Sequence, residues 1–103
     1  MIVVISTLRL WNGEGASWHF IDVPAEMASD IRAHSLANRG GFGSVRVEAT
    51  IGDPSTSSGE AVIWRTSVFP QKSGGYLLPV KREVRRSAGI AAGDEVTVEL
   101  ELL

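Results

Sequence analysis

The sequence predicts a small closed β-barrel with two short helices, in the order β-β-α-β-β-β-α-β. Apolar and polar residues alternate through most of the chain, as they do in strands with one buried face. Turn-forming residues separate the alternating segments at short intervals, so the strands are short and numerous. With 103 residues, of which 44% are hydrophobic and 21% charged, the chain has the size and composition of one globular domain, residues 1–103.

Residues 2–10 and 17–23 are predicted to form a hairpin of two strands. The residues between them, Asn12-Gly13-Glu14-Gly15, tolerate the positive φ angles that tight hairpin turns require. The apolar residues of the first strand fall on one parity and are therefore expected to face the core: Ile2, Val4, Leu8 and Leu10.

Each of the two predicted helices follows a proline. Pro24 is expected at the first position of a helix over 25–37, because its missing N–H has no helical partner there. Pro79 is likewise expected to introduce a helix that runs to about Ala88, and Gly89 suits the left-handed position that ends it. The residues expected to face the core are Met27, Ile31 and either His34 or Ser35 on the first helix, and Val80, Val84 and Ala88 on the second.

Four further strands are predicted over residues 44–51, 61–69, 76–78 and 96–102. The polar loop Asp53–Ala61 precedes the second of them and is expected to tolerate shortening. A strand, a proline, a helix and a strand occur twice along the chain, at Val23-Pro24 to Val45–Glu48 and at Leu78-Pro79 to Val96–Glu99. Such a repeat predicts a barrel with an internal pseudo-two-fold axis, although matches this short also arise by chance.

Composition excludes several classes of protein. The absence of cysteine excludes a disulfide framework, cysteine-ligated zinc, an iron–sulfur cluster and a thiol nucleophile. Ten basic and 12 acidic residues give a net charge of −2, which does not indicate a nucleic-acid or membrane partner. The early apolar run Met1–Ile5 is too short for a signal peptide or a spanning helix, so we expect a cytoplasmic protein.

Basic residues concentrate on the second predicted helix, where only Glu83 is acidic. One interpretation is a solvated outer face, paired with the acidic Asp94, Glu95, Glu99 and Glu101. The other is a contact with phosphate, carboxylate or nucleic acid. The four basic residues, which form two pairs at helical i,i+4 spacing, are Lys81, Arg82, Arg85 and Arg86.

The remaining candidate motifs have simple structural explanations. His19 and His34 lack the spacing of a metal site, and no nucleophile elbow is present, so no metal and no catalytic triad are predicted. The glycine-rich segment 40–43 has the context of a turn rather than of a phosphate loop. The aromatic residues are expected mostly in the core, except that Trp11, beside the first turn, is expected at the mouth of the barrel.

Four segments, which cover nearly the whole chain, carry a resemblance to a known family. They are Trp18–Pro24, Val45–Gly52, Trp64–Pro70, and Gly74–Lys81 with the later Arg85 and Gly93–Val96. In these segments the chain resembles the bacterial and archaeal family called Domain of Unknown Function nineteen-oh-five. It departs from the family in the longer loop Asp53–Ala61. The resemblance implies a double-split β-barrel similar in architecture to the AbrB class of transcription regulators, and it implies no activity.

Together these observations predict a non-enzymatic module that binds a small anionic ligand or a protein, as a monomer or weak homodimer without a cofactor. The candidate ligand-binding residues are Trp11, Trp64, Arg65, Ser67, Lys81 and Arg85. The alternative is a DNA-binding barrel that uses Lys81, Arg82, Arg85 and Arg86, against which the net charge of −2 argues. A second alternative is a small enzyme with Arg65, Ser67 or Arg85 around an anionic substrate, but no general base is evident.

Overall fold

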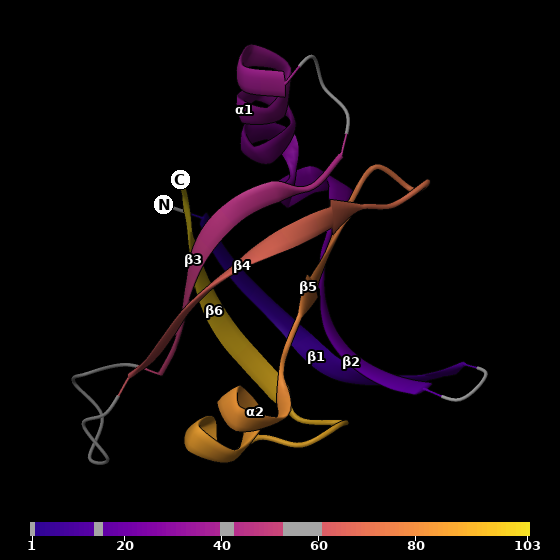
Figure 1. Cartoon of the computed structure of the whole chain (residues 1–103), viewed down its shortest axis with the longest axis vertical. Coiled ribbons are helices and arrows are strands. Elements are labelled where there is room, and N and C mark those ends of the chain that lie inside the picture. The colour runs from indigo at the N-terminus through magenta and orange to yellow at the C-terminus, as the bar shows by residue number, and fades with distance from the viewer. Residues whose placement is uncertain (1, 14–15, 40–42, 53–60) are drawn as a thin grey trace.

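Six antiparallel strands close a barrel in the spatial order β1-β2-β5-β4-β3-β6 (Figure 1). The structure, a computed structural model, describes residues 2–13, 16–39, 43–52 and 61–103. The predicted fold class and the predicted order of strands and helices are confirmed. The elements are β1 (Ile2–Gly13), β2 (Ala16–Val23), the 3-10 turn η1 (Ala25–Met27), α1 (Ser29–Arg39), β3 (Val45–Ile51), β4 (Val62–Pro70), β5 (Tyr76–Pro79), α2 (Arg82–Ala88) and β6 (Glu95–Leu102).

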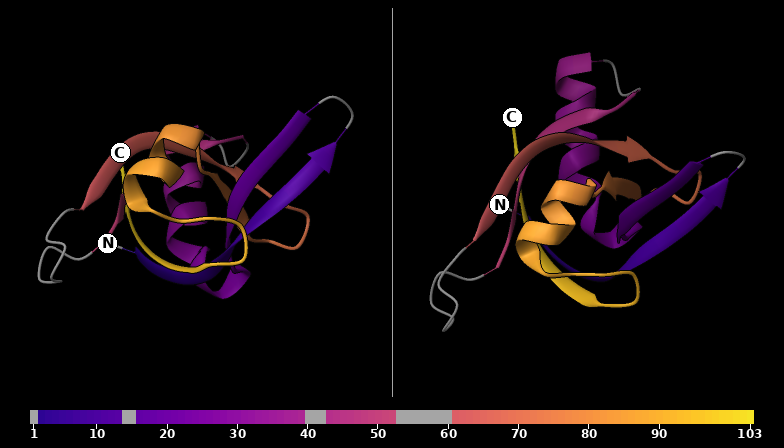
Figure 2. Two further views of the ribbon diagram at one scale, coloured as in Figure 1. Left: turned by 90° about the horizontal axis from the view of Figure 1, so that it is seen from below. Right: turned by 60° about the horizontal axis from the view of Figure 1, so that its bottom comes forward.

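Alternate residues of the strands fill the barrel, as the sequence pattern predicts. On β3 every second residue is buried, and so are the first three apolar residues of β6. Leu10 is exposed, so the prediction that it faces the core is wrong. Beyond Leu8, β1 pairs only with β2, and the two strands project from the barrel as a hairpin (Figure 2). The largest fully buried side chains are Leu8, Ile21, Ile31, Leu78, Leu100, Val4, Val23, Val47, Val68 and Val98.

Both helices begin later than predicted. Pro24 is extended and precedes η1, so that Ala28 rather than Met27 turns into the core. Pro79 is the last residue of β5, and the Val80 N–H continues the strand ladder with a 3.0 Å bond to the His19 carbonyl. α2 therefore starts only at Arg82, and it ends, as predicted, at the left-handed Gly89 (φ 68°). Within the described chain, no helix has the length and apolar character needed to cross a membrane.

The barrel has the two-fold symmetry that the sequence repeat predicts. β1 pairs first with β6 and then with β2, and β4 likewise pairs first with β3 and then with β5. Exchange of β1, β2 and β3 for β4, β5 and β6 leaves the set of paired strands unchanged. The register of the strand pairing follows the same symmetry. Leu8 pairs with Ile21 in β1 and β2, and at the equivalent position of β4 and β5 Pro70 pairs with Tyr76. α1 and α2 accordingly lie at opposite ends of the barrel (Figure 1).

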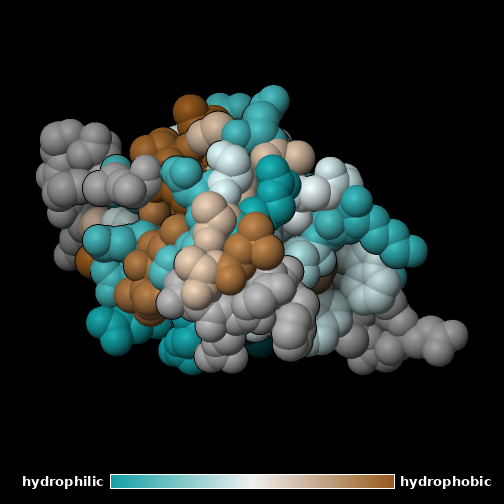
Figure 3. Space-filling view, turned by 90° about the horizontal axis from the view of Figure 1, so that it is seen from above, coloured by the Kyte–Doolittle hydropathy of each residue, from teal (hydrophilic) through white to brown (hydrophobic). Residues whose placement is uncertain are grey.

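The outer surface is not uniformly polar. Seen from the α1 end, hydrophobic residues reach the surface beside hydrophilic ones (Figure 3). Val3 and Ile5 on β1 and Ile63 on β4 are exposed because they occupy the outward parity of their strands. The carboxylates Glu48, Glu95, Glu99 and Glu101 lie on β3 and β6, across the barrel from β2 and β5. One side of the barrel is thus acidic, while the basic residues of 81–86 lie at the α2 end.

Candidate functional site

A groove opens where β4 and β5 separate. These strands pair through only two residue pairs, at Phe69 and Pro70, so the earlier part of β4 has no β5 neighbour. α2 lies beside this gap, at the lower end of the barrel in Figure 1. The groove has a volume of about 500 Å³, and its walls come from β2, β4 and the segment around α2. The lining residues are Ser17, Trp18, His19, Thr66, Phe69, Pro79, Val80, Lys81, Arg82, Glu83 and Arg85.

The groove carries three cationic side chains. Lys81 and Arg82 are exposed at the start of α2. Arg85 is half-buried, and its Nη1 donates a 2.8 Å hydrogen bond to the Val80 carbonyl, which holds its guanidinium against the barrel. Among the described residues none of the basic residues of 81–86 forms an ion pair, so the predicted pairing with the acidic residues of 94–101 is wrong. These cations are therefore available to a bound anion.

His19 lies in the groove with an unusual protonation equilibrium. Burial lowers the pKa of its imidazole, and the positive charge of Arg85 lowers it further. The usual value for histidine is about 6.5, so the ring is neutral at neutral pH. A neutral imidazole leaves the positive charge of this groove to Lys81, Arg82 and Arg85.

Aromatic rings form the opposite wall of the groove and continue beyond it. Trp18 is 51% exposed and Phe69 is 46% exposed, both at the groove. Trp18 stacks on Phe20 with ring centroids 6.5 Å apart and an interplanar angle of 12°. Trp11 pairs directly opposite Trp18 on the hairpin, so the two indoles share one face.

A second, smaller hollow of about 290 Å³ lies on the same outer face. It is lined by Arg9, Trp11, Phe20 and Leu77. Arg9 forms an ion pair with Asp22, and its Nη2 donates to Asp22 Oδ1 at 2.8 Å. The charge of Arg9 is therefore balanced locally, and the second hollow offers mainly apolar surface.

The structure disperses the predicted ligand-binding residues. Only Lys81 and Arg85 lie together, in the groove, while Trp11 borders the second hollow. Neighbouring residues of a strand point to opposite faces, so Trp64 packs against the core whereas Arg65 points outward and pairs with Glu48 at 3.3 Å. The Trp64 Nε1 is buried without a hydrogen-bond partner among the described atoms. Ser67 lies in a third cavity, at the α1 end.

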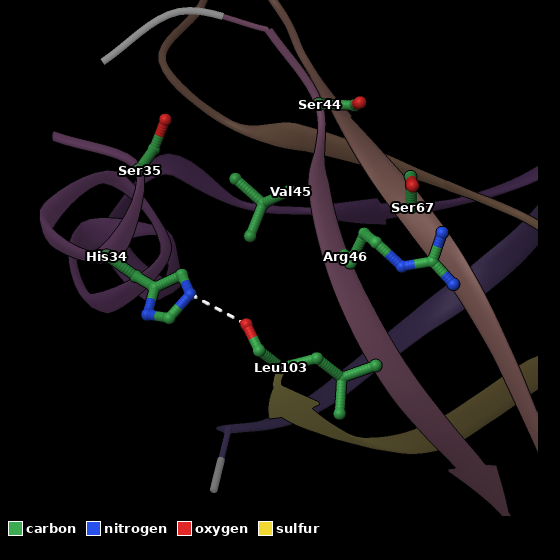
Figure 4. Close-up of a pocket in the computed structure, with 7 residues that line it drawn as sticks. All are labelled: His34, Ser35, Ser44, Val45, Arg46, Ser67 and Leu103. Carbon is green, nitrogen blue, oxygen red and sulfur yellow. Dashed lines mark hydrogen bonds between the residues drawn. The ribbon is translucent and has the colours of Figure 1, made fainter. Parts of the chain in front are cut away.

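This third cavity, of about 480 Å³, is lined by His34, Ser35, Ser44, Val45, Arg46, Ser67 and Leu103 (Figure 4). His34 and Ser35 lie on the α1 side of β3, and Arg46 points to the other side. The His34 Nε2 is 3.0 Å from the Leu103 carbonyl, and the Ser35 hydroxyl points away from the imidazole. The polar groups of this cavity do not converge on one point, so it lacks the geometry of a catalytic site. Among the described residues, no three potential metal ligands lie together.

Three residues of the groove lie outside the predicted set of ligand-binding residues: Trp18, Phe69 and His19. The exposure of Trp18 and Phe69 also contradicts the expectation that the aromatic residues other than Trp11 lie mostly in the core. Trp18 had a usable signal, because a hairpin whose strands pair as far as Gly13 and Ala16 places it directly opposite Trp11. No sequence signal predicts Phe69 or His19 at the site. They border the groove only because β4 separates from β5 and because α2 begins as late as Arg82.

One comparison with known proteins identifies a family. The sequence model of the family described as "Domain of unknown function (DUF1905)" matches residues 5–100. The matched region contains most of β1 and β6 and all the elements between them. No curated protein matches the chain.

Proposed function

This chain belongs to the DUF1905 family, and we propose that it is a binding module that takes a small anionic ligand in the groove between β4 and β5. The observation that carries the proposal is the placement of Lys81, Arg82 and Arg85 opposite the exposed rings of Trp18 and Phe69. No activity comes with the family description, so the proposal depends on this geometry alone.

The charges of the groove favour an anion. Three cations face one carboxylate, that of the exposed Glu83. Arginine guanidinium groups form the strongest hydrogen bonds to carboxylates and phosphates. The anionic group of the ligand is therefore expected at Lys81 and Arg82, with Arg85 behind them.

The rings favour a ligand with a planar or apolar part. Trp18 and Phe69 present about half of their surface to solvent, which is large for residues of their type. A planar group that covers these rings removes apolar surface from water and adds stacking. The best ligand thus combines an aromatic group with a phosphate or carboxylate.

Binding is favoured over catalysis by the arrangement of the residues. The enzymatic alternative requires Arg65, Ser67 or Arg85 around one substrate, yet Arg65 and Ser67 lie on the outer face of β4 and neither lines the groove that contains Arg85. In the groove, burial and the charge of the Arg85 guanidinium lower the pKa of His19, so its imidazole is neutral. A bound anion would offset the charge of Arg85 and so raise the pKa of His19.

Phenyl phosphate, which joins a ring to a phosphate, tests the proposal by isothermal titration calorimetry. We expect phenyl phosphate to bind more tightly than either inorganic phosphate or phenol. Arg82→Gln should weaken binding about tenfold, since it removes a charged hydrogen-bond donor. Arg46→Gln removes an exposed cation on β3 and should leave affinity unchanged. No binding below about 10 mM, or equal affinity in both variants, would contradict the proposal.

Duplex DNA is the alternative ligand for the same cations. Arg85 is held by the Val80 carbonyl, which leaves Lys81, Arg82 and Arg86 for phosphate contacts. We do not favour this alternative, because the cations adjoin rings that a stacked duplex does not cover. Submicromolar binding of a duplex at physiological salt, abolished when Arg82, Arg85 and Arg86 are changed to glutamine, would favour it.

A further inference from the structure

Aromatic rings extend beyond the groove in a continuous series, of which Trp11, Trp18 and Phe69 are exposed. Phe69 and Trp18 border the groove, Phe20 stacks on Trp18, and Trp11 lies opposite Trp18 and borders the second hollow. We call these four residues the aromatic strip. A small ligand in the groove does not reach Trp11, which lines only the second hollow among the cavities described here. The 52% exposure of Trp11 therefore calls for a longer ligand.

The position of the strip makes its rings accessible. Trp11 and Trp18 lie on the part of the hairpin that projects from the barrel (Figure 2). β5 pairs with β2 only from Phe20 onward, and the Val80 N–H adds a last bond to the His19 carbonyl, so beyond these points the two strands of the hairpin pair only with each other. Trp11 and Trp18 are positioned by the strand pairing of the hairpin, and about half of the surface of each residue is exposed. They form a platform with an open face.

The charge around the strip is suited to a polyanion. Lys81 and Arg82 lie at the groove end of the strip, while Asp22 beside Phe20 is neutralised by Arg9. Most of the acidic side chains described above lie across the barrel on β3 and β6. A chain of phosphates can therefore approach this face without meeting the acidic side, despite the net charge of −2.

We propose that single-stranded nucleic acid binds along the aromatic strip, with bases stacked on Trp11, Trp18 and Phe69 and phosphates directed to Lys81 and Arg82. Stacking of successive bases on aromatic side chains, next to a basic groove, is the usual way in which proteins hold single strands without reading sequence. A duplex keeps its bases stacked on each other and cannot use these rings. The inference deepens the proposed function, because the phosphate in the groove is the anion assigned there.

The test is fluorescence anisotropy with a labelled oligothymidylate of about 12 nucleotides, at low salt. Trp11→Leu should weaken binding about tenfold, because one base loses its stacking partner. Trp11→Phe keeps a ring and should retain most of the affinity. Ile63→Ala, which removes an exposed apolar side chain of β4 opposite Thr50 of β3 and outside the groove, is the matched control and should have no effect. Trp11 is half exposed, and thermal melting of each variant verifies that the fold is kept.

The outcomes separate this inference from the proposed function. If Trp11→Leu leaves the affinity for phenyl phosphate unchanged and lowers the affinity for the oligonucleotide, both the proposed function and this inference are supported. Phenyl phosphate binding without any oligonucleotide binding overturns the inference and leaves the proposed function standing. Equal oligonucleotide affinity of wild type and Trp11→Leu, or equal affinity for a duplex of the same length, also overturns the inference. If neither probe binds, both proposals are wrong.

Discussion

Arg85→Gln should destabilise the fold, although the residue lies on a helix of mostly exposed cations. Its Nη1 donates a 2.8 Å hydrogen bond to the Val80 carbonyl, and Val80 itself is buried. A hydrogen bond from a charged donor contributes about 1.5–3 kcal/mol, and partial exposure of Arg85 places the expected loss at the lower end, about 1.5–2 kcal/mol. For a domain of this size, that loss lowers Tm by roughly 5–10 °C. Chemical denaturation and differential scanning calorimetry measure both quantities.

Two neighbours provide matched controls for Arg85. Arg82 and Arg86 are exposed and form no ion pair among the described residues, so their change to glutamine should alter the free energy of unfolding by less than about 0.5 kcal/mol. Arg85→Lys keeps the charge but loses the planar donor, and should fall between wild type and Arg85→Gln. An Arg85→Gln variant as stable as wild type, or an Arg82→Gln variant equally destabilised, would refute the role assigned to this hydrogen bond.

Three further variants test the fold and the groove. Asp94→Ala should cost about 1 kcal/mol in unfolding free energy, because the Ala91 N–H donates to Asp94 Oδ2 at 2.8 Å, and phenyl phosphate affinity should not change. The lowered pKa of His19 means that the unfolded chain binds a proton there first as the pH falls. The free energy of unfolding of wild type should therefore decrease as the pH drops through about 6.5, and His19→Gln should flatten that dependence in urea titrations. Gly75→Ala should destabilise by about 2–3 kcal/mol, because its Cβ would lie 2.4 Å from the Val23 carbonyl oxygen; unchanged melting would refute this clash.

The parts of the fold that could be predicted are those governed by local periodicity. Val47, Ala49 and Ile51 are buried as their alternation predicts, because this part of β3 is paired on both sides within the barrel. Leu10 has the same parity as Leu8 but projects with the hairpin, which only the switch of β1 from β6 to β2 explains. Such a switch depends on pairing between distant segments, and alternation along one strand does not reveal it.

The candidate site could be predicted only in part for the same reason. The sequence predicts Lys81 and Arg85 together because their basic cluster is contiguous. It also predicts Trp64 and Arg65 in the same site, but adjacent strand residues face opposite sides of the sheet. Arg85 donates to the Val80 carbonyl and Asp94 accepts from the Ala91 N–H, and a basic cluster or an acidic run in the sequence reveals neither contact.

Two sequence-based expectations stay predictions. The likeness to AbrB-class barrels implies a shared architecture that the strand order of one chain does not test. The loop Asp53–Ala61 lies almost wholly outside the described residues, but Ile51 and Val62 on either side of it are directly paired. A short connection can therefore join β3 to β4, and replacement of 54–59 by two glycines should preserve the fold.

Nuclear magnetic resonance mapping of the phenyl phosphate site tests the central claim most directly. The three tryptophans give three indole N–H signals, and the structure places them in three environments: the groove, the second hollow and the barrel core. We predict that phenyl phosphate shifts the Trp18 indole and the backbone amides of residues 80–86, while the Trp64 signal stays in place. Shifts confined to Trp64, or to the α1 end around Ser35 and Ser44, would contradict the assignment of the groove as the binding site.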